Sequence, residues 1–389
     1  MARIGWFLLT SPSFLVHDVV LDSAEVPSGG SSAFVGYDRR PAHPRPFRSW
    51  PANTWQRRPP ATFADIDGAV WTVESVTTHV TWTMIIEESG LRIAVTGASG
   101  RIGNAVVAAA VADGHSIVAL DRAAAPTDSG SADPASRPRT PLDTTTGATD
   151  VASEVKWLDV TDLEAFAAQI DGCDAMIHLA AVPSPWGRQA HDVHANNVVG
   201  SYHAFLAAAE VGIHRVAWAS SINAIGGYYS QAPRFDYFPV DEEHPTYAED
   251  AYSLSKWLGE QQADAMIRLH PDLTIASIRL HGARAQDPRI RPRSEEEPPD
   301  DRLRAEARHL WGWVDIHAVA GAFLSALGAD LSGHEAFFVV APTTTTSVPS
   351  AELQTRYYPD VPVRRPLEGR AGFYDCGKAA KLLGWTHDA

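Results

Sequence analysis

The chain has 389 residues, a formal net charge of -15 at pH 7 and 45% hydrophobic residues. This length accommodates one large α/β domain or two smaller ones, with enough apolar side chains for a full core. The acidic charge argues against nucleic acid or an anionic membrane surface as a partner, and no apolar run reaches the roughly 18 residues of a membrane span.

Two cysteines, Cys173 and Cys376, are too few for a disulfide framework and lack the spacing of metal ligands. Such cysteine usage is typical of a reducing compartment. We therefore expect a cytoplasmic protein without a metal site, and we expect Cys173 to fill space in the core.

Residues 1–88 differ in composition from the rest of the chain. Segments 39–46 and 57–60 are rich in arginine and proline, and no helical or strand period emerges. We therefore expect a poorly structured N-terminal extension. An alternative is that the functional protein starts near Met84, just ahead of the first predicted core strand.

A glycine-rich turn follows the short apolar strand predicted at 93–95. Glycines at 97, 100 and 103 lead directly into an alanine-rich helical pattern. One glycine suits the tight turn, one lets a pyrophosphate approach bare backbone, and one allows close helix–strand packing. The helix N-terminus adds unpaired N–H groups and the positive end of its dipole. The turn predicts a dinucleotide site, with a purely structural turn as the alternative.

A second strand is predicted at 116–120, and Asp121 stands at its end. This carboxylate, 18 residues beyond Gly103, is placed to accept hydrogen bonds from the adenosine ribose and to repel a 2′-phosphate. We therefore expect NAD as the cofactor. NADP stays open, because the neighbouring Arg122 could hold that phosphate.

The core pattern is interrupted at 123–153, a stretch without apolar periodicity that reads as a flexible insert. It resumes with a strand at 155–158, a helix at 162–170 and a strand at 175–179. Asp159 and Val160 at one strand end suit an adenine ring, and small residues end the next strand. Alternating strands and helices predict a doubly wound parallel α/β sheet with ligands at the carboxyl ends of its strands.

The predicted catalytic residues follow in the next units, Ser221 after the strand at 215–219 and Tyr252 and Lys256 in a later helical run. A tyrosine and a lysine four residues apart share one helical face. The ammonium should lower the phenol pKa, making Tyr252 a general acid/base. Lys256 could also hold the nicotinamide ribose, and Ser221 could hydrogen-bond a substrate oxygen.

These motifs resemble the extended short-chain dehydrogenase/reductase family, the NAD-dependent epimerase/dehydratases, from Arg92 to Trp385. The matching segments are Thr96–Gly103, Asp121, His178–Ala181, Asn196–Gly200, the Ser221, Tyr252 and Lys256 triad, and the closing segment 375–385. The resemblance implies a Rossmann-like fold, an NAD(P)-dependent enzyme and pairing of protomers through the helices that flank the active site. The expected cofactor contacts are Gly97, Ser99, Gly100, Arg101, Ile102, Gly103, Asp121, Arg122, Asp159, Val160, Leu179, Ala180, Ala181, Asn196, Tyr252 and Lys256.

Two departures from the family bear on the substrate. The dehydratases' acidic residue is missing from Ser220–Ile222, which disfavours dehydration, and Gly282 replaces an asparagine that helps epimerases hold a diphosphate. Only about thirty residues separate His281 from the helix predicted at 313–327, so a small sugar acid, lactone or other carbonyl compound is expected. Uronate dehydrogenases in the family are similarly short. A nucleotide-sugar epimerase and a non-catalytic dinucleotide-sensing regulator remain alternatives.

The predicted domain boundaries are an extension at 1–88, an NAD(P)-binding domain at 89–280 and a small substrate cap at 281–389 with elements returning to the core. A late strand at 336–340 and helices at 350–357 and 376–383 are expected to complete the cap. The candidates for contacting an anionic substrate are Arg279, His281 and Arg284, with a structural ion pair as the alternative for each.

Overall fold

A computed structural model describes residues 70–74, 81–85, 90–124, 155–284 and 298–388, in two units that divide between Ser89 and Gly90. In the first unit, β1 (Val70–Glu74) pairs antiparallel with β2 (Thr81–Ile85). This pair was not predicted, although β-branched and aromatic residues dominate both strands. The remainder of the expected N-terminal extension lies outside the described residues. Met84, the alternative start, lies within β2 opposite Trp71.

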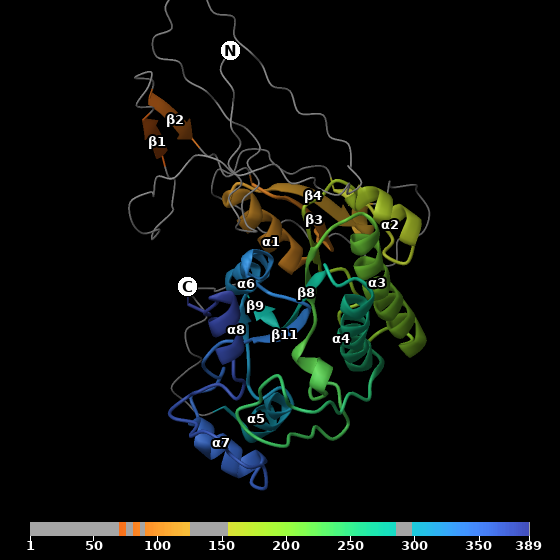
Figure 1. Ribbon diagram of the computed structural model, residues 1–389. Helices are drawn as coiled ribbons and strands as arrows, with labels where there is room; N and C mark the ends of the chain where they lie inside the picture. Colours follow the sequence, from red (N-terminus) through yellow and green to blue (C-terminus); the bar gives the residue numbers. More distant parts are fainter. Residues whose placement is uncertain (1–69, 75–80, 86–89, 125–154, 285–297, 389) are drawn as a thin grey trace, which may run out of the picture. The chain divides into compact units, whose positions relative to one another are not determined.

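The second unit is built on a seven-stranded parallel sheet in the order β11-β8-β7-β6-β3-β4-β5. Its strands are β3 (Arg92–Thr96), β4 (Ser116–Asp121), β5 (Lys156–Trp157), β6 (Ala175–His178), β7 (Arg215–Ala219), β8 (Thr274–Leu280) and β11 (His334–Val339). Helices cover both faces of this sheet (Figure 1). The doubly wound parallel α/β sheet predicted from the sequence is confirmed.

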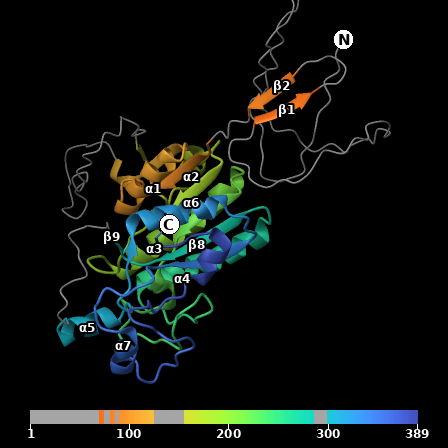
Figure 2. The ribbon, with the colours of Figure 1, turned by 90° about the vertical axis from the view of Figure 1, so that its left-hand side faces the viewer.

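Alternate side chains of each central strand enter two separate cores. Ile93 and Val95 face the cluster beneath α1 (Arg101–Ala112) and α6 (Ile316–Gly328), which lie in front of the sheet in Figure 2. Ala94 faces the cluster shared with α2 (Leu163–Ile170), α3 (Ala190–Glu210) and α4 (Ala251–Leu269). Burial on both faces explains why these strands are apolar without alternation.

A third apolar cluster lies beyond the sheet, where α5 (Asp300–Ala307) and α7 (Ser350–Tyr357) pack with the loops after β7. Trp311 is fully buried in it, 5.4 Å from Phe373 between ring centroids. Trp311 is therefore part of the apolar packing of this region. Within the described residues, no helix is both long enough and apolar enough to cross a bilayer.

The structure corrects two expectations about the C-terminal third. The strand expected to complete the cap is β11, which instead extends the main sheet beside β8. The helix expected to start at 313 begins at Ile316, because Val314–Asp315 forms a short strand, β10, alongside β9 (Ala283–Arg284). Asp315 then caps α6 by accepting from the His317 backbone N–H at 2.8 Å. The last helix, α8 (Gly377–Leu383), packs against α6 and β11.

Candidate active site

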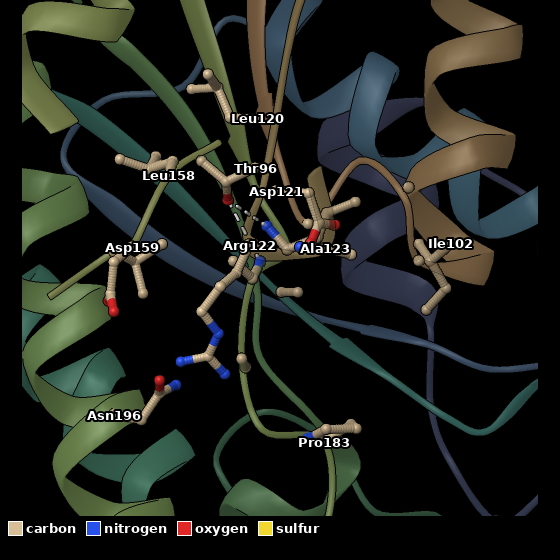
Figure 3. Close-up of a pocket in the computed structure, with 18 of the residues that line it drawn as sticks. Thr96, Ile102, Leu120, Asp121, Arg122, Ala123, Leu158, Asp159, Pro183 and Asn196 are labelled. Atoms are coloured by element: carbon tan, nitrogen blue, oxygen red, sulfur yellow. Dashed lines mark hydrogen bonds between the residues drawn. The ribbon is translucent and has the colours of Figure 1, made fainter. Parts of the chain in front are cut away.

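A cavity of about 550 Å³ lies at the carboxyl ends of β3, β4, β6 and β7, where ligands bind in open parallel sheets (Figure 3). Most of the predicted cofactor residues line it: Gly97, Gly100, Arg101, Ile102, Gly103, Asp121, Arg122, Asp159, Val160, Leu179, Ala180, Ala181 and Asn196. Ser99, Tyr252 and Lys256 are not among the lining residues. Further lining residues were not predicted from the sequence as cofactor contacts: Thr96, Leu120, Ala123, Leu158, Pro183 and Ala219. Thr96 and Ala219 end strands and could have been found by applying the strand-end rule throughout.

The glycine turn has a shape that side chains would destroy. Gly97 adopts a left-handed φ of +70°, and a Cβ there would lie 2.9 Å from the Ala180 nitrogen. A Cβ on Gly103 would lie 2.2 Å from the Gly97 carbonyl oxygen. The first backbone N–H of α1 with a helical partner is that of Asn104, which donates to Gly100 at 2.9 Å. The N–H groups before it have no acceptor within the helix. Bare backbone and free N–H groups fit a pyrophosphate.

Asp121, the last residue of β4, is fixed against this turn. Its two carboxylate oxygens accept hydrogen bonds from the backbone N–H groups of Ser99 and Ala123, both at 2.9 Å. Ser99 thus supports the cofactor site through Asp121. These two hydrogen bonds hold the carboxylate in one orientation, as expected for a group that accepts hydrogen bonds from ribose hydroxyls.

Arg122 extends into the cavity toward Asn196 and Asp159 (Figure 3). Burial opposes ionisation of Asp159, but hydrogen bonds from Thr161 and the Arg122 charge hold the pKa of Asp159 below its usual range. An exposed guanidinium and an ionised carboxylate therefore face the same end of the cavity.

Lys256 links the cavity to the helix that carries Tyr252. Its Nζ donates a hydrogen bond of 2.6 Å to the carbonyl of Ala219, a residue that lines the cavity. Burial lowers the pKa of Lys256 to about 7, although the nearby Glu260 carboxylate acts in the opposite direction. The ammonium also lies 5.0 Å from the centroid of the Trp218 ring.

The tyrosine pKa does not follow the expectation from the Tyr–Lys spacing. Burial raises the pKa of Tyr252 to about 12, and the Ser221 side chain, which hydrogen-bonds the phenol, acts to lower it. The expected net lowering of the Tyr252 pKa is therefore wrong for this structure, because removal from water dominates even with the Lys256 Nζ 5.8 Å from the ring centroid. Tyr252 is only 8% exposed.

Two adjacent serines at the end of β7 have different partners. Ser220 donates to Glu260 at 2.6 Å and is thereby committed to α4. Ser221 precedes a 3₁₀ turn at Ile222–Ile225, where its Oγ accepts from the Asn223 backbone at 3.1 Å. The structure brings Ser221, rather than Ser220, to the Tyr252 hydroxyl.

The three residues expected to contact an anionic substrate have separate surroundings. Arg279 is buried and forms a bidentate pair with Glu260, at 2.9 Å from Nε and 2.8 Å from Nη2. His281 is also buried, where burial lowers its pKa to about 3, and its Nδ1 accepts from the Gly282 backbone. Both contacts favour the structural alternative. Arg284 is exposed at the end of β9.

Buried polar side chains hold the strand ends that frame the cavity. The Asn197 amide bonds the Val182 backbone twice, at 2.8 Å from its N–H and 3.0 Å to its carbonyl. His178 pairs with the Thr96 hydroxyl at 2.7 Å, and burial lowers the His178 pKa to about 3. His178 is thus a neutral core residue. Among the described residues, no three or more His, Cys, Asp or Glu side chains gather as a metal site would require.

Comparison with known proteins agrees with this geometry. Residues 93–289 match the model of the NAD dependent epimerase/dehydratase family. An NAD-dependent glucose-6-phosphate dehydrogenase of Haloferax volcanii is 30% identical over 229 residues, which is 56% of this chain and 74% of that protein. A uronate dehydrogenase of Pseudomonas putida is 30% identical over 36% of this chain and 48% of its own length.

A solved structure, the UDP-glucose 4-epimerase of Thermotoga maritima with UDP-glucose, superposes with a TM-score of 0.51 at 19% identity. The match covers 77% of this chain and 94% of that one. At this identity it speaks for the fold. With the family match and the dinucleotide cradle, it leads to one conclusion: the chain belongs to the NAD dependent epimerase/dehydratase family of enzymes.

Proposed function

We propose that this protein is an NAD(P)-dependent oxidoreductase that oxidises or reduces a carbon–oxygen centre of a small sugar, sugar acid or related carbonyl compound. The observation that carries the proposal is the hydrogen bond from Lys256 to Ala219. Ala219 lines the dinucleotide cavity, and Lys256 lies one helical turn from Tyr252. The acid/base pair is thereby tied to the strand end where the cofactor would lie.

Each catalytic side chain has a distinct task in this proposal. A bound nicotinamide supplies the hydride acceptor or donor. In the oxidising direction, Tyr252 as phenolate takes the substrate's hydroxyl proton while the carbon-bound hydrogen leaves as hydride. Ser221 steadies the substrate oxygen, and protonated Lys256 stabilises the phenolate that its burial otherwise disfavours. In the reducing direction the same phenol returns the proton.

Asp121 supports a preference for NAD. Its carboxylate is fixed by two backbone donors, so it cannot turn away from a 2′-phosphate without losing both hydrogen bonds. The negative charges of this carboxylate and of a 2′-phosphate beside it repel each other. We propose that NAD is used in preference to NADP, even with Arg122 nearby.

The test is a steady-state assay of purified protein with NAD⁺ or NADP⁺ and a panel of D-glucose, glucose 6-phosphate, L-arabinose, D-glucuronate and UDP-glucose. We expect net formation of reduced cofactor with at least one free sugar or sugar acid. Interconversion of UDP-glucose with UDP-galactose, without net reduction of cofactor, would instead support the epimerase alternative. Binding of dinucleotide with no turnover of any carbonyl compound would support the regulator.

A further inference from the structure

A continuous run of aromatic rings leads from Tyr252 to the protein surface. The Tyr229 ring lies 5.6 Å from that of Tyr252, and the Trp186 ring lies 5.0 Å from Tyr229, nearly perpendicular to it. Tyr228 completes the group, 4.9 Å from Tyr229 and 5.4 Å from Trp186. We call Trp186, Tyr228 and Tyr229 the aromatic wall. Trp186 is 64% exposed, which is unusual for the largest apolar side chain.

The aromatic wall is held in place from two directions. Gly226 and Gly227 both have left-handed φ values, +84° and +132°, which turn the chain sharply after the 3₁₀ turn. Arg308 then grips this segment by donating to the Tyr228 carbonyl at 3.1 Å and to the Ser230 carbonyl. Because the segment that carries Tyr228 and Tyr229 is fixed in this way, their rings lose little conformational freedom when a ligand packs on them.

The loop that carries Trp186 also borders the dinucleotide cavity. Pro183 lines the cavity three residues earlier, and the intervening Ser184 accepts from the Trp186 backbone at 3.1 Å. The Ser184 side chain also hydrogen-bonds Tyr229. One short loop thus joins the cofactor site to the aromatic wall.

His309 stands at the other side of the wall, with its ring 5.3 Å from Tyr228. Its Nδ1 is buried and, apart from a contact of the ring with its own backbone, has no hydrogen-bond partner among the described residues. A buried polar atom of this kind is costly unless something binds it. Burial also lowers the pKa of His309, so the ring is neutral and can accept or donate one hydrogen bond.

The backbone beside His309 is strained in a way that typically marks functional sites. Leu310 and Trp311, neither of them glycine, have left-handed φ values of 57° and 51°. Both side chains are fully buried, which provides the packing that maintains this conformation. The strained turn fixes the His309 carbonyl, which accepts from Gly312 N–H at 3.1 Å.

We propose that the aromatic wall and His309 form the subsite for the ring of a free sugar. The C–H face of a pyranose packs against Trp186 and Tyr229, one of its hydroxyls bonds His309 Nδ1, and the carbon to be oxidised lies at Tyr252. Aromatic side chains with a few polar groups are typical of such pockets. This inference rests on the proposed oxidoreductase function.

Two arginines of this region are not available to a diphosphate. Arg279 is bound to Glu260, and Arg308 is bound to the backbone carbonyls of the wall segment. A diphosphate requires cations that are available to it. Arg188 and Arg284 are exposed, so the UDP-glucose arm of the test below decides between a free sugar and a nucleotide sugar.

The test compares Trp186→Ala and Trp186→Phe with Trp157→Ala, a matched change at an exposed tryptophan (42%) on β5. With the free sugar that the wild type oxidises best, we expect Trp186→Ala to raise KM about tenfold, the loss of one aromatic contact, and Trp186→Phe to restore most of it. In the Trp186 variants, the kcat value and the Kd for NAD should stay within about twofold. Trp157→Ala should leave KM, kcat and the Kd for NAD unchanged. An unchanged KM in Trp186→Ala would overturn the subsite.

A second measurement does not depend on turnover. Saturation-transfer NMR with D-glucose, D-glucuronate and UDP-glucose on NAD-loaded Tyr252→Phe protein should show strong contact to ring C–H protons of a free sugar, lost in the Tyr252→Phe, Trp186→Ala double variant. Sugar contact without wild-type turnover would support the subsite and contradict the proposed function. Turnover that is insensitive to Trp186 would do the reverse. Transfer to the uracil and ribose protons of UDP-glucose alone would overturn the free-sugar assignment.

Discussion

The two halves of the candidate site are built by different means. The dinucleotide half is centred on one continuous stretch, from β3 through the glycine turn to Asp121, in which backbone geometry provides most of the chemistry. Later strand ends complete its lining. The substrate half gathers side chains from three segments, near Trp186, Tyr228 and His309, that are far apart in the chain. The first can be recognised by spacing, whereas the second exists only once the chain has folded.

This difference separates what each half contributes. A glycine turn serves any ligand with a pyrophosphate, because its hydrogen bonds come from backbone N–H groups. Side chains assembled by folding can change without disturbing that turn. The dinucleotide half is therefore characteristic of the family, whereas the substrate half determines the individual reaction.

Tyr252→Phe tests the point where the two halves meet, and we expect the largest effect there. Removing the hydroxyl eliminates proton transfer, which should lower kcat by about 10³-fold. The Kd for NAD should change little, because Tyr252 does not line the dinucleotide cavity. Steady-state kinetics and calorimetric NAD titration measure the two quantities. Normal turnover in this variant would remove Tyr252 from the mechanism.

Gly103→Ala should damage the dinucleotide half alone. The added Cβ would lie 2.2 Å from the Gly97 carbonyl oxygen and 2.7 Å from that of Ala98. Both are backbone atoms, which cannot move away without distorting the turn. We expect the Kd for NAD to rise on the order of a hundredfold, about 2.7 kcal/mol.

Gly321→Ala is the matched control for the glycine turn. This glycine lies within α6, and no atom beyond its chain neighbours and its own helical backbone lies within 4 Å of an added Cβ. Alanine is favoured over glycine by about 1 kcal/mol inside a helix, so the melting temperature should hold or rise and NAD binding should be unchanged. Equal loss of NAD affinity in both variants would mean that the turn has no special role.

Asp121→Asn should alter cofactor choice by a smaller amount. Asparagine keeps one acceptor oxygen, for one of the two backbone N–H groups, and removes the charge that repels a 2′-phosphate. We expect the ratio of kcat/KM for NAD over NADP to fall about tenfold, equivalent to about 1.4 kcal/mol. Asp113→Asn, an exposed change at the end of α1, should leave the ratio as it is.

The sequence predicts the sheet and the dinucleotide half well because both depend on local patterns. Apolar runs, glycine spacing and the residue after each strand identified most of the cavity lining. The tyrosine pKa was wrong because spacing reveals a neighbouring ammonium but not burial, and burial dominates here. Arg279 likewise looked available until folding placed Glu260 against it.

Trp186 and His309 were missed because nothing in the local sequence marks them. One is a loop aromatic, and the other follows a short helix that the composition did not predict. Their proposed role depends on contacts with Tyr228 across the fold. β11 was placed in the cap because its order in the chain follows the cap segments, whereas its pairing with β8 is a long-range choice.

Asp264 offers a test of that placement of β11, with the smallest effect. His334 at the start of β11 bonds both Asp264 on α4 and Ser277 on β8, each at 2.8 Å. The hydrogen bond from His334 lowers the pKa of Asp264 despite its partial burial.

A lowered folded-state pKa stabilises the protein above the unfolded pKa value of about 4, and that stability is lost as pH falls from there toward the folded-state pKa. Asp264→Asn should therefore cost under about 1 kcal/mol at pH 7, because the carboxylate is partly exposed, and should flatten the acid limb of denaturant-derived stability between pH 7 and pH 3. Exposed Asp330→Asn serves as control. If both variants follow the wild-type curve, the contact does not bind β11 to the core measurably.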